Sequence, residues 1–275
     1  MVAKQQYLLY DENCPLCNWY TRMFVKFNFI ASESRVSYQK VANNTDLLFD
    51  RERAKSEIAL ISIGEETLYG IDSMLKVLGT KWSVIPFIGN FFPIYWVLQL
   101  CYRFISFNRK IIAPTVCETA CSCTPKFSLF WRLFFIGFCG GMTYFFVGSY
   151  FNSQLNPYLW NGIFSFEFTL FMAQLVFQTL IFKCLRQFDI FTYLGHLAFI
   201  SLLGAIALGW VEFFLSVFSY FNLETTLLAP FFFGVIVCCM IIEHGRRVKL
   251  LGLSSKLTLS LVLFRILIYP LVFTL

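Results

Sequence analysis

Charged residues are scarce in this sequence of 275 residues. Only 14% of them are Asp, Glu, Lys or Arg, whereas 58% are hydrophobic and 20% are aromatic. Soluble domains average about 25% charged and about 45–50% apolar residues. The composition therefore excludes an intrinsically disordered chain, which needs low hydrophobicity and high charge, and it excludes a collagen-like repeat.

A recognisable secretory signal is also missing. The apolar stretch 7–10 is too short for the hydrophobic core of a signal peptide. We therefore expect the first half of the chain to stay in the cytosol. The ten cysteines are then expected to serve redox chemistry, metal binding or burial rather than a structural disulfide framework.

The few charges are unevenly placed. Residues 1–127 hold 14 of the 22 Lys and Arg residues, whereas residues 128–275 contain long uncharged runs. This asymmetry predicts a soluble domain at 1–115, a cysteine-containing linker at 116–127 and an all-α membrane domain of about five transmembrane helices at 128–275.

Five windows support the membrane domain, because a bilayer span needs about 20 mostly apolar residues. They are 129–150, 159–182, 193–214, 225–242 and 257–275. Basic residues gather in the second and fourth connections, so the positive-inside rule predicts a cytosolic N-terminal domain and an outside C-terminus, in the cytoplasmic membrane. A sixth span over 82–107 is disfavoured, because Pro86 and Pro93 interrupt it; an interfacial or buried helix is expected instead.

The first half alternates short strands with helices. The expected elements are strand 6–10, helix 14–30, strand 35–40, helix 45–55, strands 58–63 and 67–69, and a helix from Asp72, as its cap, to 78. This β-α-β-α-β-β-α order carries a C-x-x-C motif between the first strand and the first helix, and it predicts a thioredoxin-like α/β fold.

The position of this motif has chemical consequences. Cys14 is expected in the first helical turn, where free backbone N–H groups stabilise a thiolate, so it is the predicted nucleophile. Cys17 lies one turn further and is predicted to resolve the mixed disulfide. Asp11 has two interpretations: it caps the helix, or it accepts the proton of Cys17.

The segment from Tyr10 to Cys17, YDENCPLC, resembles the D-x-x-C-x-x-C signature of the DCC family of thiol-disulfide oxidoreductases. Gly70-x-Asp72-Ser73 and Asn108-Arg109 resemble later landmarks of that family. The resemblance extends over about residues 5–115 and implies a thioredoxin-like redox domain with Cys14 and Cys17 as its dithiol. Unlike thioredoxins and glutaredoxins, the chain has no proline before its third strand, where 55–57 reads Lys-Ser-Glu.

Three further cysteines, Cys117, Cys121 and Cys123, precede the first membrane window. They are interpreted as a thiol cluster without a defined role, as a second dithiol that receives electrons from Cys14, or as zinc ligands together with Cys14 and Cys17. Two C-x-x-C arms, the usual zinc-ribbon arrangement, are not present. The sequence therefore predicts no resident cofactor, with zinc as the alternative.

The membrane half contains candidate sites of its own. Cys139, Cys238 and Cys239 fall at overlapping depths, so they are either an intramembrane dithiol or simply small buried hydrophobic residues. Glu167 and Arg265 also reach similar depths, and we expect them to pair across the bundle, as a packing device or as part of a transport or quinone site. Two other ionisable residues, His196 and Glu212, are expected near opposite interfaces, in contact with water.

The sequence thus predicts a membrane-anchored thiol-disulfide oxidoreductase of the protein-disulfide reductase type. Its expected partners are a thiol or disulfide substrate, the lipid bilayer and membrane-complex subunits, without nucleic acid. Two alternatives stay open. One is a transmembrane electron conduit through the intramembrane cysteines, and the other is a zinc-stabilised, non-enzymatic subunit of a larger assembly.

Overall fold

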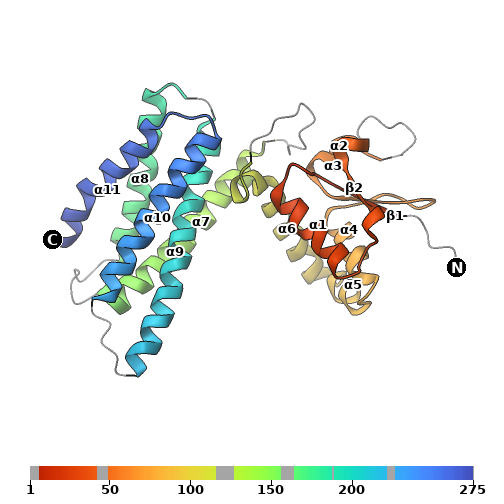
Figure 1. The fold of residues 1–275 in the computed structure, drawn as a ribbon, viewed down its shortest axis with the longest axis horizontal. Coiled ribbons are helices and arrows are strands. Elements are labelled where there is room, and N and C mark those ends of the chain that lie inside the picture. The colour runs from red at the N-terminus through yellow and green to blue at the C-terminus, as the bar shows by residue number, and fades with distance from the viewer. Residues whose placement is uncertain are drawn as a thin grey trace. The chain divides into compact units, whose positions relative to one another are not determined.

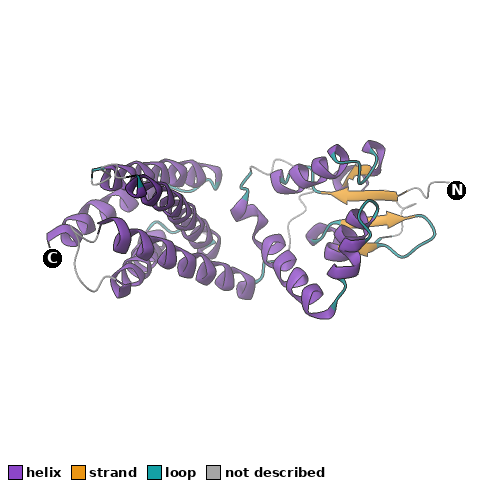
Figure 2. Cartoon of the chain, turned by 90° about the horizontal axis from the view of Figure 1, so that it is seen from below, coloured by secondary structure: helices purple, strands orange, loops and turns teal. Residues whose placement is uncertain are grey.

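The computed structural model describes residues 6–41, 49–115, 127–155, 164–187, 189–221 and 227–274. The chain divides into two units, residues 1–131 and 132–275. The first unit combines a small sheet with helices, and the second has helices but no strand among its described residues (Figures 1 and 2).

The sheet of the first unit has the strand order β2-β1-β3-β4. Strand β1 (Gln6–Tyr10) is parallel to β2 (Arg35–Ser37) and antiparallel to β3 (Ala59–Ser62), which pairs antiparallel with β4 (Leu68–Tyr69). Parallel neighbours need a crossover, and α1 (Pro15–Lys26) provides it. The predicted element order is therefore confirmed.

Both faces of this sheet are covered. The other described helices of the unit are η1 (Ser32–Ser34), α2 (Tyr38–Val41), α3 (Arg51–Ser56), α4 (Gly70–Gly79), α5 (Val84–Gly89) and α6 (Phe92–Ile112). Adjacent residues of a strand point to opposite faces. Leu8 accordingly packs with Phe24 of α1 and Val77 of α4, whereas Leu9 packs with Tyr38 of α2 and Ala54 of α3.

Several element boundaries differ from the predicted ones. Helix α1 ends at Lys26 rather than near residue 30, because Asn28 adopts a left-handed conformation with φ +56°. Strand β2 stops at Ser37, where α2 begins. Asp50 caps α3 by accepting the backbone N–H of Arg53 at 3.0 Å.

Asp72 is not the cap of its helix. Helix α4 begins two residues earlier, at Gly70, and the Asp72 carboxylate instead accepts the hydroxyl of Tyr95 at 3.0 Å. The early start is possible because Gly70 takes φ +60°, a conformation that lets the chain turn directly from β4 into the helix. In the 82–107 region, the two helices α5 and α6 replace the disfavoured sixth span.

The second unit consists of long helices joined by connections. Its described elements are α7 (Leu129–Tyr150, starting in the first unit), η2 (Phe151–Leu155, a π-helical segment), α8 (Phe164–Cys184), α9 (Ile190–Tyr220), α10 (Leu228–Leu250) and α11 (Lys256–Thr274). Helix α9 packs along α10, and α11 packs against both α8 and α10. Gly204 permits close approach of α9 to α10, because a Cβ there would lie 2.2 Å from the sulfur of Met240.

Three stretches of described residues are long and apolar enough to cross a membrane. They are Leu129–Leu155, Ile190–Tyr220 and Leu228–Leu250. The apolar described part of α8, Thr169–Cys184, is shorter than the span criterion. The all-helical, apolar character of the second half is therefore confirmed, and five crossings stay a prediction.

Candidate active site

Cys14 stands where the loop after β1 becomes helix α1. It is the N-cap residue of α1, with extended backbone angles (φ −92°, ψ 112°), and its Sγ accepts the backbone N–H of Cys17 at 3.5 Å. Pro15 follows at the first helical position, where a missing N–H costs nothing. An N-cap side chain normally satisfies such an N–H with oxygen. Here the thiol sulfur occupies that place, so the local fold aims N–H groups at the candidate nucleophile.

The two thiols of the motif have opposite acid strengths. A hydrogen bond from the Cys17 thiol to Cys14 lowers the pKa of Cys14 to about 6, and it raises the pKa of Cys17. The Cys17 backbone N–H and the Arg109 cation also lower the Cys14 pKa, whereas burial and the Asp11 carboxylate raise it. At neutral pH the pair therefore holds one negative charge, on Cys14.

Arg109 reaches this pair from α6, far along the chain. Its Nη1 lies 4.0 Å from the Cys17 sulfur, and its Nη2 donates to the backbone carbonyl of Lys55 at 2.9 Å. The side chain is only 7% exposed. In the sequence, Arg109 is part of a family landmark, but 92 residues separate it from Cys17, so the sequence does not predict it as a site residue.

Asp11 lies beside Arg109 rather than at the helix end. Its Oδ2 is 3.6 Å from Nη2 of Arg109, and both side chains are 7% exposed. Its Oδ1 accepts the backbone N–H of Asn13 at 3.1 Å and the side-chain amide of Gln39 at 2.7 Å. The interpretation of Asp11 as the helix cap is therefore wrong, since Cys14 holds that position.

Helix α6 also supports the loop that lacks the proline. One face of α6 presents Tyr102, Ser106 and Arg109. The Tyr102 oxygen accepts the N–H of Ile58 at 2.9 Å, and the Ser106 hydroxyl donates to the carbonyl of Ser56 at 2.5 Å. Together with the bond from Arg109, these contacts satisfy three backbone groups just before β3, on the side of the dithiol.

Hydrogen bonds of Thr21 and Arg35 stabilise the N-terminal part of α1. The hydroxyl of Thr21, which is fully buried, donates to the carbonyl of Cys17 at 2.7 Å and accepts Nε of Arg35 at 2.9 Å. Arg35 also bonds the side chain of Asn18. These contacts tie β2 to the turn that carries Cys17.

The structure describes only some of the other predicted thiol sites, and these differ in exposure. The sites Cys117, Cys121 and Cys123 lie outside the described residues. Cys139 is fully buried, whereas Cys238 and Cys239 are exposed, and each of them is a free thiol. Among the described residues no group of three or more potential ligands is placed to hold a metal ion.

Polar groups in the helical unit are more extensively bonded than predicted. His196 is 3% exposed and its Nδ1 lies 2.9 Å from Nη1 of Arg247, so it is not solvated. Glu212 accepts the hydroxyls of Ser149 and Ser153 at 2.8 and 2.7 Å. The side chain of Glu167 lies outside the described residues, and its pairing with Arg265 stays a prediction.

Most of the first unit is similar to a known protein family. No curated protein and no solved structure matched the chain. Residues 8–113 match the family model of the DCC1-like thiol-disulfide oxidoreductases, from β1 to the end of α6. The match includes Asp11, Cys14, Cys17 and Arg109. The resemblance predicted from the sequence is thus confirmed: residues 8–113 match the model of the DCC1-like thiol-disulfide oxidoreductase family.

Proposed function

We propose that the first unit is a thiol-disulfide oxidoreductase of the protein-disulfide reductase type, with Cys14 as nucleophile and Cys17 as resolving thiol. The observation that carries this proposal is the position of Cys14 as N-cap, where the N–H and the thiol of Cys17 both stabilise its sulfur as a thiolate. A thiolate, not a thiol, attacks disulfides.

The reaction proceeds in two exchanges. The Cys14 thiolate attacks one sulfur of the substrate disulfide, so a mixed disulfide forms and the first substrate sulfur leaves as a thiolate. Cys17 then loses its proton and attacks Cys14, which forms the Cys14–Cys17 disulfide and releases the second substrate sulfur. Two electrons and the one proton held by Cys17 leave the dithiol, the second proton that the substrate thiols take up comes from water, and no further cofactor is required.

Arg109 and Asp11 act on the second exchange. Once Cys14 carries a mixed disulfide, its charge is gone, and Cys17 must ionise in a buried place. The Arg109 cation, 4.0 Å from the Cys17 sulfur, lowers the pKa of Cys17 against the effect of burial. Asp11 balances this buried cation and fixes its direction. Arg109 is thus proposed as a positioning and stabilising residue, with Asp11 acting through it.

The second unit is proposed to anchor this chemistry in the cytoplasmic membrane, with the redox unit in the cytosol. Three helices have the length and apolarity of membrane spans. The basic residues Lys183 and Arg186 lie at the C-terminal end of α8, and those from Arg246 to Lys256 lie where α10 ends and α11 begins. The positive-inside rule assigns these helix ends to the cytosol.

An apolar face on the redox unit supports the same location. Helices α5 and α6 expose Phe87 at 83% and Phe92 at 80%, beside Trp82, Val84, Phe91 and Trp96. No acidic residue occurs between Asp72 and Glu118, whereas several Lys and Arg residues do. Exposed aromatic residues within a basic segment are typical of surfaces that lie in the lipid interface. We propose that this α5–α6 face rests on the bilayer surface.

The redox proposal is tested by a thiol-trapping titration of the full chain in detergent, read by mass, with bound metal measured in the same sample. We expect one reversible two-electron couple that maps to Cys14 and Cys17. Cys17→Ser should accumulate a mixed disulfide with a disulfide substrate, whereas Cys14→Ser should form none.

The matched control is Cys101→Ser, because Cys101 is a free thiol of the same unit, exposed on α6. Its replacement should leave the couple unchanged. Retained stoichiometric zinc on thiols that do not cycle would contradict the proposal and favour the non-enzymatic alternative.

A further inference from the structure

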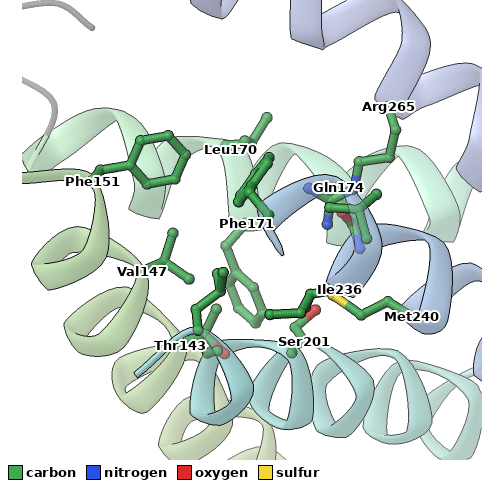
Figure 3. A pocket seen from close by; sticks show the side chains of 15 residues that line it. Thr143, Val147, Phe151, Leu170, Phe171, Gln174, Ser201, Ile236, Met240 and Arg265 are labelled. Atoms are coloured by element: carbon green, nitrogen blue, oxygen red, sulfur yellow. The ribbon is translucent and has the colours of Figure 1, made fainter. Parts of the chain in front are cut away.

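The helical unit contains a cavity that the redox proposal does not use. Its volume is about 80 Å³, it is open on one side, and side chains of α7, η2, α8, α9, α10 and α11 contribute to its wall (Figure 3). Most of the wall is apolar, including Val147, Phe151, Leu208 and Phe233.

One end of the cavity is polar. There the side chains of Gln174 and Arg265 converge, with Ser201 across from them (Figure 3). Gln174 is 3% exposed. Elsewhere on the wall, the hydroxyl oxygen of Thr143 is buried without a hydrogen-bond partner in the part of the chain that the structure describes. Buried polar groups normally have partners, so these side chains favour a ligand that carries polar atoms.

The positive charge of Arg265 favours an anionic partner. A guanidinium within an apolar bundle is costly unless an anion pairs with it. The described carboxylates of the unit are engaged elsewhere: Asp189 caps α9, Glu212 accepts two serine hydroxyls, and Glu243 pairs with Arg246 and Arg247. The cavity wall beside Arg265 is formed by Gln174, which lies two helical turns beyond Glu167.

We propose that this cavity binds an amphiphile with an anionic head and an apolar chain. Arg265 pairs with a carboxylate or phosphate, and the Gln174 amide donates a hydrogen bond to it. The Ser201 hydroxyl donates to the carbonyl of Leu197 and lines the same part of the wall. The chain lies along Val147, Phe151, Leu208 and Phe233. A free fatty acid and an acidic phospholipid both present this chemistry.

The test uses the full-length protein in nanodiscs of phosphatidylcholine, titrated with spin-labelled stearate at pH 8 and followed by electron paramagnetic resonance. We expect an immobilised, saturable component that unlabelled stearate displaces, whereas stearate methyl ester competes at least about tenfold more weakly. Displacement by phosphatidylglycerol as well identifies phospholipid as a source, and displacement by stearate alone identifies a free fatty acid.

Variants locate the site. Arg265→Gln should weaken stearate binding at least about tenfold, and Ala205→Phe, which fills the cavity, should abolish it. Arg246→Gln removes an exposed arginine outside the cavity and should bind as the wild type does. Equal competition by stearate and its methyl ester would overturn the proposal. Binding only after Glu167→Gln would also overturn it, because Glu167 would then already neutralise Arg265.

Discussion

At the scale of single residues, Cys14 and Cys17 have the same side chain and lie three positions apart, yet they differ in acid strength. The difference arises because α1 begins between them: Cys14 accepts hydrogen bonds at the helix end, and Cys17 donates them from inside the first turn, through its backbone N–H and its thiol. An oxidoreductase needs this asymmetry, since one sulfur must attack while the other waits.

This asymmetry predicts the pH dependence of alkylation. With a pKa of about 6, Cys14 should react with iodoacetamide at a nearly constant rate above pH 7 and lose about tenfold in rate for each unit below pH 6. Because this pKa lies below the ordinary thiol value of about 8.5, ionisation of Cys14 stabilises the reduced fold above that pH, and the benefit fades as pH falls through 6. Mass spectrometry of the labelled peptide measures the rate, and a midpoint near 8.5 would contradict the assignment.

The Arg109 cation should account for part of the lowered pKa of Cys14. Arg109→Gln removes the cation that lowers the pKa of both cysteines, so the alkylation midpoint of Cys14 should rise by about one pH unit. Resolution of a mixed disulfide should slow as well, because Cys17 ionises less readily. Arg103→Gln is the matched control, as Arg103 is an exposed arginine of the same helix. Equal midpoints for the two variants would show that Arg109 serves packing only.

At the scale of elements, α6 is the part of the fold that unites the site. It is distant in sequence from the dithiol, yet it supplies Arg109 to the sulfur atoms and bonds the backbone before β3 through Tyr102 and Ser106. Thioredoxins and glutaredoxins place a proline in that loop. In this chain, helix α6 holds the loop through hydrogen bonds to its backbone.

The turn from β4 into α4 should be sensitive to a single methyl group. Gly70 has φ +60°, and a Cβ there would lie 3.0 Å from Oε2 of Glu57 and 3.1 Å from the ring of Tyr102. Gly64 has φ +83° but open space around it. Gly64→Ala should cost about 1 kcal/mol from backbone strain, and Gly70→Ala at least about twice that.

Thermal unfolding of the full chain, read by alkylation of buried Cys17, compares the two variants within the first unit. Equal unfolding midpoints for Gly64→Ala and Gly70→Ala would show that the side chains of Glu57 and Tyr102 move aside without a cost in free energy.

At the scale of the whole molecule, the exposed aromatic residues of α5 and α6 should contact lipid. A nitroxide at position 87, in a protein lacking other reactive cysteines, should collide more with oxygen than with a water-soluble nickel complex in nanodiscs. A label at position 19 replaces another exposed aromatic side chain, on α1, and should show the reverse. A water-like signal at position 87 would exclude the bilayer as the partner of the α5–α6 face.

Features that depend on local patterns could be predicted from the sequence. Alternating and helical periodicities predicted the strands, the helices and the location of the dithiol, and apolar runs predicted the helical second half. The C-x-x-C motif predicted the family that residues 8–113 match. Boundaries were less certain, because Asn28 and Gly70 end or begin helices through backbone angles that composition does not reveal.

Contacts between residues that are far apart in the chain became known only from the tertiary structure. Arg109 comes to Cys17 across 92 residues, Asp11 pairs with that arginine instead of capping α1, and His196 is buried against Arg247 rather than solvated. The cavity with Gln174 and Arg265 likewise requires five helices. The physical reason is common to all of these. Electrostatic and hydrogen-bonding partners are selected by proximity in space, and neither residue type nor spacing along the chain specifies which buried groups will meet.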